Sequence, residues 1–459
     1  MRDRHDSQEN PNKIARFFSF AEYGTNFRTE TLAGITTFLT MAYILVVNPS
    51  ILSDAIFLNV PQDLFPQLIF VTAISAAIAT AIMGIAANYP FALAPGMGLN
   101  AFFAYSVVLE LGIDWRVALA AIFIEGILFI LLTLTNLRQL VVNSIPNSLK
   151  HATASGIGLF IAYIGLSGAG IIVTGQGTIT TLGDFSQPPA LMAIAGILVT
   201  TAFVARRITG ALLWGILATA ILAWIVGAAP LPEGIAGYPP LPIDLVGQAI
   251  TGLLSFNLTQ IWDFLAVLFV FLFIDFFDTI GTLTGVGIQA GYINENGELP
   301  RANPALMADA IGTTIGALLG TSTVTTYIES AAGVSEGGRT GFTAIIVALL
   351  FTLSIFFIPL ISGIPAFATV PALVIVGVLM TGSVRYIRWD DPAESIPSFL
   401  TILIMPLSNS IAEGLAVGFI TYPLVKAFQG KIQETTLILW ILAGIFVLRF
   451  ILEGLNWTD

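Results

Sequence analysis

The sequence has 459 residues, of which 56% are hydrophobic and only 10% are charged, whereas a soluble domain is about 25% charged. This composition excludes an ordinary soluble protein. Apolar stretches of about 20 residues that recur from end to end indicate an all-α, polytopic membrane protein. The chain has no cysteine, which excludes disulfides and thiolate chemistry, and it has no basic patch with interleaved aromatic residues to support nucleic-acid binding.

The first 30 residues are polar and are expected to be cytoplasmic. They lack the apolar core of a signal peptide, so the chain is expected to enter the membrane through its own first helix. Ile14–Phe20 is predicted to be a short amphipathic stretch on the membrane surface. The two histidines, His5 and His151, are too far apart to form a metal motif, so neither a metal nor a cofactor is expected.

Fourteen membrane spans are predicted, and some of them are short or broken. They lie near residues 31–48, 67–87, 95–110, 117–135, 147–167, 189–205, 210–228, 262–287, 304–319, 323–336, 341–360, 371–387, 395–407 and 409–427. One more apolar segment, 436–453, follows, and it is left open whether this segment spans the membrane.

The positions of Lys and Arg predict the orientation. If the N-terminus is cytoplasmic and fourteen spans alternate, all but two of the 17 Lys and Arg residues lie on the cytoplasmic side. The exceptions are Arg116 and Arg449. Reading 395–427 as a single span would move Lys426 and Lys431 outside, so two short spans are preferred. We therefore expect a multi-pass protein of the cell (inner) membrane with a cytoplasmic N-terminus.

The chain is predicted to contain two seven-span repeats, at residues 31–228 and 262–427. Residues 229–261 are the expected extracytoplasmic connection, and 428–459 form a C-terminal segment with the extra apolar helix. The third span of each repeat is interrupted, at Pro95–Phe102 and at Thr321–Ser330, and the Thr-rich start of the second favours extended backbone. Because seven is odd, the repeats would be inverted, and paired broken spans indicate a transporter binding site. The alternative is that both segments are Gly- and Thr-rich loops.

The eighth span carries two acids. Asp275, Asp278, Thr279 and Thr282 are spaced i, i+3, i+4 and i+7, which places them in one stripe of the helix. A charged side chain at mid-membrane costs about 2.5–3.5 kcal/mol, so the stripe must face a partner, a ligand or water. A structural pair, neutralised by protonation or by another helix, is the alternative to a substrate and proton site.

Asn100, the two aspartates and Glu329 are expected at similar depth, without a nearby Lys or Arg. Carboxyl groups in such a place can hold a proton near neutral pH, and they suit a ligand with N–H donors and ring acceptors. Half-helices after the two interruptions would direct backbone N–H groups at this ligand. Aromatic side chains that could stack on a flat ring are Phe102, Phe276, Phe277 and Tyr327.

Two other acids, Glu125 and Asp309, stand alone in apolar helices. We interpret both as hydrogen-bond partners in helix packing rather than as parts of the site.

Three motifs resemble the AzgA-like purine permeases, which take up adenine, guanine and hypoxanthine with protons and are related to bacterial uracil permease. They are Ala94–Ala101, Ile274–Thr282 and Thr325–Gly333, and the resemblance runs from about residue 15 to residue 430. It implies fourteen spans in two inverted repeats, with spans 1–4 and 8–11 as a core and spans 5–7 and 12–14 as a gate. It leaves a homodimer open as the assembly.

The resemblance also implies roles for single residues. Asn100, Asp278 and Glu329 would bind substrate, and Ala101 and Ile328 beside them complete the expected substrate-binding set. Asp275 is the expected proton-coupling residue. The expected partners are therefore a purine nucleobase, protons and the lipid bilayer.

Two other functions are weighed against this one. An anion transporter of similar fold should show a cation or a carboxylate-free site, and this site shows acids. Intramembrane aspartyl proteases carry their two aspartates on two helices, one in a Gly-x-Gly-Asp motif, whereas here both lie on one predicted helix and the motif is absent. The sequence therefore favours a transporter, not an enzyme.

Overall fold

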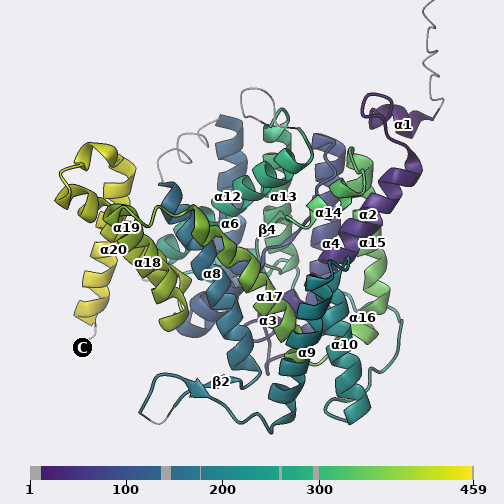
Figure 1. Cartoon of the computed structure of the whole chain (residues 1–459), viewed down its shortest axis with the longest axis horizontal. Coiled ribbons are helices and arrows are strands. Elements are labelled where there is room, and N and C mark those ends of the chain that lie inside the picture. Colours follow the sequence, from purple (N-terminus) through teal and green to yellow (C-terminus); the bar gives the residue numbers. More distant parts are fainter. Residues whose placement is uncertain (1–11, 136–145, 176, 258–260, 293–298, 457–459) are drawn as a thin grey trace, which may run out of the picture.

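A computed structural model describes residues 12–135, 146–175, 177–257, 261–292 and 299–456, most of them in helices (Figure 1). Three of the Lys and Arg residues that predict the orientation, Arg2, Arg4 and Arg138, lie outside these ranges, as do residues 1–11 of the N-terminal segment.

The first half of the chain follows the predicted spans closely, and it has two interruptions. The first span divides into two helices, and the third begins with a strand. The elements are α1 (Lys13–Phe17), α2 (Phe27–Met41), α3 (Ile44–Leu52), α4 (Phe65–Ile82), the π-helix η1 (Met83–Ala87), β1 (Leu93–Pro95), α5 (Met97–Ala101), the π-helix η2 (Phe102–Glu110), α6 (Trp115–Thr135), α8 (Asn147–Gly168), β2 (Ile172–Val173), β3 (Thr181–Leu182), α9 (Pro188–Ala205) and α10 (Ala211–Val226).

The second half also has a strand at the start of its third predicted span, but its first predicted span is a single continuous helix. Its elements are α11 (Gln248–Ser255), α12 (Ile261–Gln289), α13 (Ala302–Leu319), β4 (Val324–Thr326), α14 (Ser330–Ser335), α15 (Gly341–Ser354), the short turns η4 (Ile355–Phe357) and η5 (Ala366–Thr369), α16 (Ile358–Ser362), α17 (Val370–Thr381), η6 (Gly382–Tyr386), α18 (Pro392–Leu407), α19 (Ile411–Phe428), η7 (Ile432–Glu434) and α20 (Leu437–Asn456).

Nine of the described helices are long and apolar enough to cross a membrane, and four shorter apolar helices accompany them. The four are Met97–Glu110, Ala211–Val226, Pro392–Leu407 and Leu437–Ile451. The expected ninth and tenth spans are not among them, because α13 is rich in polar and small residues and α14 has only six residues. The short extended stretches predicted in spans 3 and 10 are present as β1 and β4.

The helices pack in two groups. One group, which we name the core group, contains α2, α4 and α6 from the first half with α12, α13, α14 and α15 from the second. The other, the gate group, contains α8, α9 and α10 with α17, α18 and α19. Each group therefore joins helices from both halves of the chain, and α20 lies at the edge beside α19 (Figure 1).

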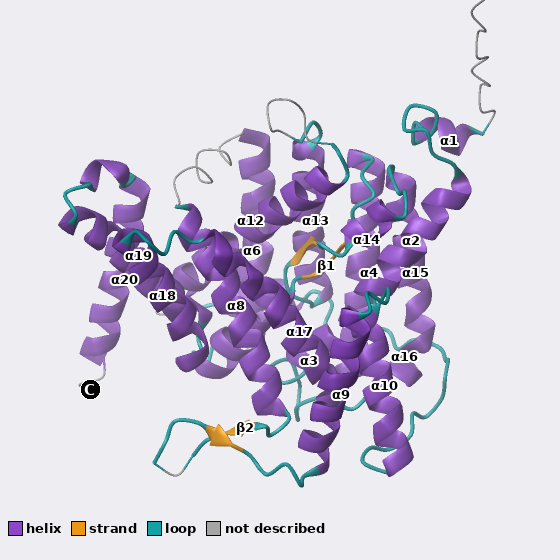
Figure 2. Cartoon of the chain, viewed as in Figure 1, coloured by secondary structure: helices purple, strands orange, loops and turns teal. Residues whose placement is uncertain are grey.

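The connections hold elements that the sequence analysis did not predict. β2 and β3 form a small antiparallel hairpin outside the helices, whereas β1 lies among them (Figure 2). The connection at 229–261 contains α11, which packs on α6. The hairpin and α11 are short elements in connections without a long apolar stretch, so hydrophobicity alone does not predict them.

Close backbone contacts between small residues join the core group. A Cβ atom added to Gly341, at the start of α15, would lie 1.9 Å from the Gly84 carbonyl oxygen in η1. The Gly341 N–H also donates to Asn88 Oδ1 at 2.7 Å. A side chain at this position would push α15 away from the end of α4.

We expect Gly341→Ala to lower the free energy of unfolding by about 1–3 kcal/mol, the usual cost of forcing extra atoms into a packed interior. Gly444→Ala in α20 is the control, because a Cβ there has nothing within 4 Å. Thermal unfolding in detergent measures both variants, and equal midpoints would show that the contact at Gly341 is not tight.

Candidate functional site

Two short strands meet in the core group. β1 and β4 pair antiparallel, with Ala94 opposite Thr325. The Gly96 N–H donates to the Thr323 carbonyl oxygen at 2.9 Å, and the Tyr327 N–H donates to the Ala92 carbonyl oxygen at 2.9 Å. Helices α5 and α14 follow the strands, so the backbone here is not a continuous helix in either segment.

The local sequence explains this interruption. A Cβ atom at Gly96 would lie 2.8 Å from Thr325 Cγ2, so only glycine lets the strands approach this closely. Hydroxyl groups from neighbouring helices bind the outer edges of the strands. Thr80 Oγ1 contacts both the N–H and the carbonyl oxygen of Leu93 at 2.9 Å, and Thr313 Oγ1 donates to the Val324 carbonyl oxygen at 2.9 Å. The buried backbone groups therefore keep their hydrogen bonds.

Asn100 and Ala101 lie in α5 directly after β1, and both are buried. The Ser322 hydroxyl donates to Asn100 Oδ1. The Asn100 Nδ2 atom is buried and makes no hydrogen bond within the described part of the chain. An amide with its acceptor occupied and its donors available can bind a ligand acceptor.

Glu329 lies between β4 and α14 and is half-buried, and its neighbour Ile328 is 61% exposed. The buried Tyr43, at the break between α2 and α3, donates its hydroxyl to Glu329 Oε1 at 2.6 Å. This bond fixes one carboxyl oxygen of Glu329. Sequence reasoning missed Tyr43, because a single tyrosine in an apolar span carries no motif.

The two aspartates of α12 lie in different surroundings. Asp278 is exposed, and its charge interacts with that of Glu329. Asp275 is fully buried, and its Oδ1 atom lies 3.3 Å from Thr279 Oγ1. The stripe predicted from their spacing therefore divides into an accessible acid beside Glu329 and a buried acid that faces other helices.

The structure thus brings Asp278, Ile328 and Glu329 together as accessible residues, with Asn100, Ala101 and Asp275 buried around the two strands. Glu125 and Asp309 make hydrogen bonds between elements, as expected from their interpretation as packing partners. Thr323 Oγ1 donates to Glu125 Oε2 at 3.1 Å, and Thr279 Oγ1 donates to Asp309 Oδ2 at 2.9 Å.

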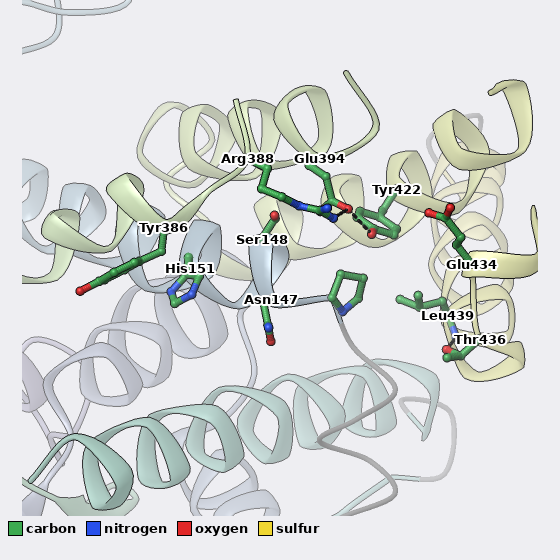
Figure 3. Close-up of a pocket in the computed structure, with 11 residues that line it drawn as sticks. Asn147, Ser148, His151, Tyr386, Arg388, Glu394, Tyr422, Glu434, Thr436 and Leu439 are labelled. Atoms are coloured by element: carbon green, nitrogen blue, oxygen red, sulfur yellow. Dashed lines mark hydrogen bonds and ion pairs between the residues drawn. The ribbon is translucent and has the colours of Figure 1, made fainter. Parts of the chain in front are cut away.

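A cavity of about 480 Å³ lies elsewhere, in the gate group (Figure 3). Its walls come from the start of α8, from η6, α18 and α19, and from η7 and the start of α20, and none of the predicted site residues lines it. The buried Lys426 binds Glu394 at 3.2 Å and Glu434 at 2.8 Å, and Arg388 pairs with Glu394. The hydrogen bond from Lys426 lowers the pKa of the Glu434 carboxyl. These charges neutralise one another and hold the C-terminal segment to the gate group.

The chain matches a family described as "Permease family" over residues 28–417. The guanine/hypoxanthine permease PbuG of Bacillus subtilis is 45% identical, over 95% of this chain and 99% of that protein. The adenine permease AdeP of Escherichia coli is 42% identical, over 98% of this chain and 99% of that protein. The transmembrane domain of the cyanobacterial bicarbonate transporter BicA has a TM-score of 0.59 and 16% identity, over 85% of this chain and 96% of that chain, and this likeness shows the fold alone.

Proposed function

The chain belongs to this permease family, and from that premise we propose that it imports purine nucleobases (hypoxanthine, guanine or adenine) together with protons. The expected resemblance to purine permeases is confirmed at the level of the family, and the chain is a multi-pass membrane protein. The relatives are named as permeases, which are transporters and not enzymes. The choice of substrate and the coupling to protons remain our proposals.

The observation that carries the proposal is the pair of accessible carboxyl groups, Asp278 and Glu329, beside the two strands. A purine ring presents N–H donors and ring-nitrogen acceptors along its edge. Carboxylate oxygens accept from the donors, and the Asn100 amide donates to an acceptor. In this proposal Ala101 and Ile328 line the same site next to Asn100 and Glu329.

Asp275 is the proposed proton carrier. It is buried next to Thr279, away from the accessible face that holds Asp278. A carboxyl group in that position can take up a proton without occupying the place of the substrate. Binding and proton uptake would then involve neighbouring residues of α12, so that one movement of this helix affects both.

The remaining parts of the proposal concern topology. We propose fourteen spans in two inverted repeats in the cell (inner) membrane, with a cytoplasmic N-terminus. The positive-inside pattern supports this orientation. The core and gate groups, each built from both halves of the chain, are the packing expected of intertwined repeats that rock against each other. A homodimer stays open as the assembly.

The fold of a bicarbonate transporter makes anion transport the rival function. The accessible acids argue against it, because carboxylates repel an anion unless a cation lies between them.

Competition for uptake separates the two functions. Uptake of labelled hypoxanthine by cells that express the chain should be reduced by unlabelled hypoxanthine, guanine or adenine and be unaffected by uracil, bicarbonate or sulfate. Cells that carry the empty vector are the control. Uptake that uracil or an anion blocks, and that none of the three purines reduces, would contradict the proposal.

A further inference from the structure

A segment rich in hydroxyl groups joins the proposed substrate site to buried acids. Residues Thr321–Thr326 carry five hydroxyl side chains in six positions, and all of them are buried. Four of these hydroxyls bind side chains from four different elements: Thr321 with Asn48 at 3.0 Å, Ser322 with Asn100, Thr323 with Glu125 at 3.1 Å, and Thr325 with Thr279 at 2.9 Å. One short segment therefore contacts a proposed substrate residue and a carboxyl group of α6.

Glu125 is the unusual member of this set. It is fully buried, and Thr323 is the donor to its Oε2 atom. Its Oε1 atom is buried and has no hydrogen-bond partner within the described residues. The charge that acts on it is another acid, Asp309 of α13. A buried carboxylate with one donor and an acidic neighbour is costly, whereas a carboxyl group that holds a proton is not.

The contacts around Thr279 indicate that Asp275 or Asp309 also holds a proton. Thr279 Oγ1 lies 3.3 Å from Asp275 Oδ1, 2.9 Å from Asp309 Oδ2 and 2.9 Å from Thr325 Oγ1. A hydroxyl group has one hydrogen and cannot donate to two carboxylates at once. One of the two aspartates must therefore supply a proton of its own for both contacts to be hydrogen bonds.

The acid whose charge acts on Glu125 is Asp309 of α13. Thr279 of α12 contacts both Asp309 and Asp275, so it connects Asp309 to the proposed proton carrier. Helix α11, which packs on α6, has no titratable side chain. The titratable residues of η2, Tyr105 and Glu110, interact with other groups. The described residues hold no group of three or more His, Asp or Glu side chains spaced to bind a metal.

We propose that Glu125 is a second proton-binding site of the transport cycle, which takes up and releases a proton as the substrate site fills and empties. The link runs from Asn100 through Ser322 and Thr323, so a purine that binds the Asn100 amide changes the position of the donor to Glu125. This inference rests on the proposed function, because it needs a substrate at Asn100 and a proton that moves with it.

Two substitutions test the site through the pH dependence of purine uptake into proteoliposomes. Glu125→Gln keeps an acceptor for Thr323 but cannot titrate, so the decline of uptake with rising external pH should become less steep. Thr323→Val removes the donor that favours the ionised form of Glu125, so the pH midpoint of uptake should move upward by about one pH unit. Thr323→Ser keeps the hydroxyl and should retain the midpoint of the unchanged chain.

The results separate this inference from the proposed function. If Glu125 only packs against its neighbours and always keeps its proton, uptake by Glu125→Gln should depend on external pH as steeply as uptake by the unchanged chain. That result would overturn the inference. If Glu125→Gln fails to fold, a midpoint for Thr323→Val equal to that of Thr323→Ser overturns it instead. If the unchanged chain imports purine without any dependence on protons, the proposed proton coupling is wrong. The inference about Glu125, which rests on that coupling, then fails as well.

Discussion

Replacing Glu329 with glutamine is expected to weaken purine affinity at least tenfold while membrane levels stay normal. Glutamine replaces two acceptor oxygens with one acceptor and one donor group, so a ring N–H loses its charge-assisted hydrogen bond. Such a bond contributes about 1.5–3 kcal/mol, and about 1.4 kcal/mol is a factor of ten. The amide oxygen of glutamine can still accept from the Tyr43 hydroxyl, which now lies 2.6 Å from Glu329 Oε1, so the fold should persist.

Equilibrium binding of labelled hypoxanthine to purified protein measures this effect. Glu336→Gln is the matched control, because Glu336 ends the same helix, α14, and is exposed away from the strands. If both variants bind with the affinity of the unchanged chain, Glu329 does not belong to the substrate site.

The second large effect is expected from Asp275→Asn, which should abolish accumulation of purine against a gradient and leave binding measurable. A neutral purine gains nothing from the membrane potential, whereas one co-transported proton gains about 2.3 kcal/mol per 100 mV. That free energy supports roughly a 50-fold gradient. Asparagine can keep the polar contact with Thr279, whose Oγ1 lies 3.3 Å from Asp275 Oδ1, but it carries no proton across.

Asp278→Asn is the comparison, and it should mainly weaken binding, because Asp278 is accessible and lies near Glu329 rather than among the buried acids. Proteoliposomes with an inward proton gradient and a pH indicator inside measure uptake and proton entry together. An Asp275→Asn protein that still acidifies the lumen as purine enters would show that the proton is carried elsewhere.

The apolar pattern predicted most helices well, because length and hydrophobicity decide whether a helix can cross a bilayer. The span expected at 117–135 is α6 at Trp115–Thr135, and the span expected at 262–287 is α12 at Ile261–Gln289. The Thr-rich start of the tenth segment also predicted β4 correctly, because β-branched residues favour extended backbone.

Partners far apart in the chain could not be predicted in this way. Tyr43 and Glu329 are 286 residues apart, and Thr323 and Glu125 are 198 residues apart. Periodicity assigns a residue to a face of its own helix, but it does not say what packs against that face. Glu125 could therefore be predicted to make a packing hydrogen bond, but its partner Thr323, which lies outside the helices and next to β4 and the proposed substrate site, could not.

The aspartates of α12 show the same limit on a smaller scale. Residues three apart on a helix point in directions that differ by about 60°. Two residues of one polar stripe can therefore face different neighbours. Asp275 is fully buried among the neighbouring elements, whereas Asp278 is exposed. The sequence predicts that both residues matter, and the tertiary structure gives them different neighbours.

The most direct measurement follows purine and protons together in proteoliposomes that contain the unchanged chain. With an inward proton gradient and no sodium, labelled hypoxanthine should accumulate inside above its external concentration, and the lumen should acidify in step with uptake. Liposomes without protein, and the same liposomes with a proton ionophore, should show neither. Uptake that ignores the proton gradient and follows sodium, or the absence of any purine uptake, would contradict the proposal of purine import by proton symport.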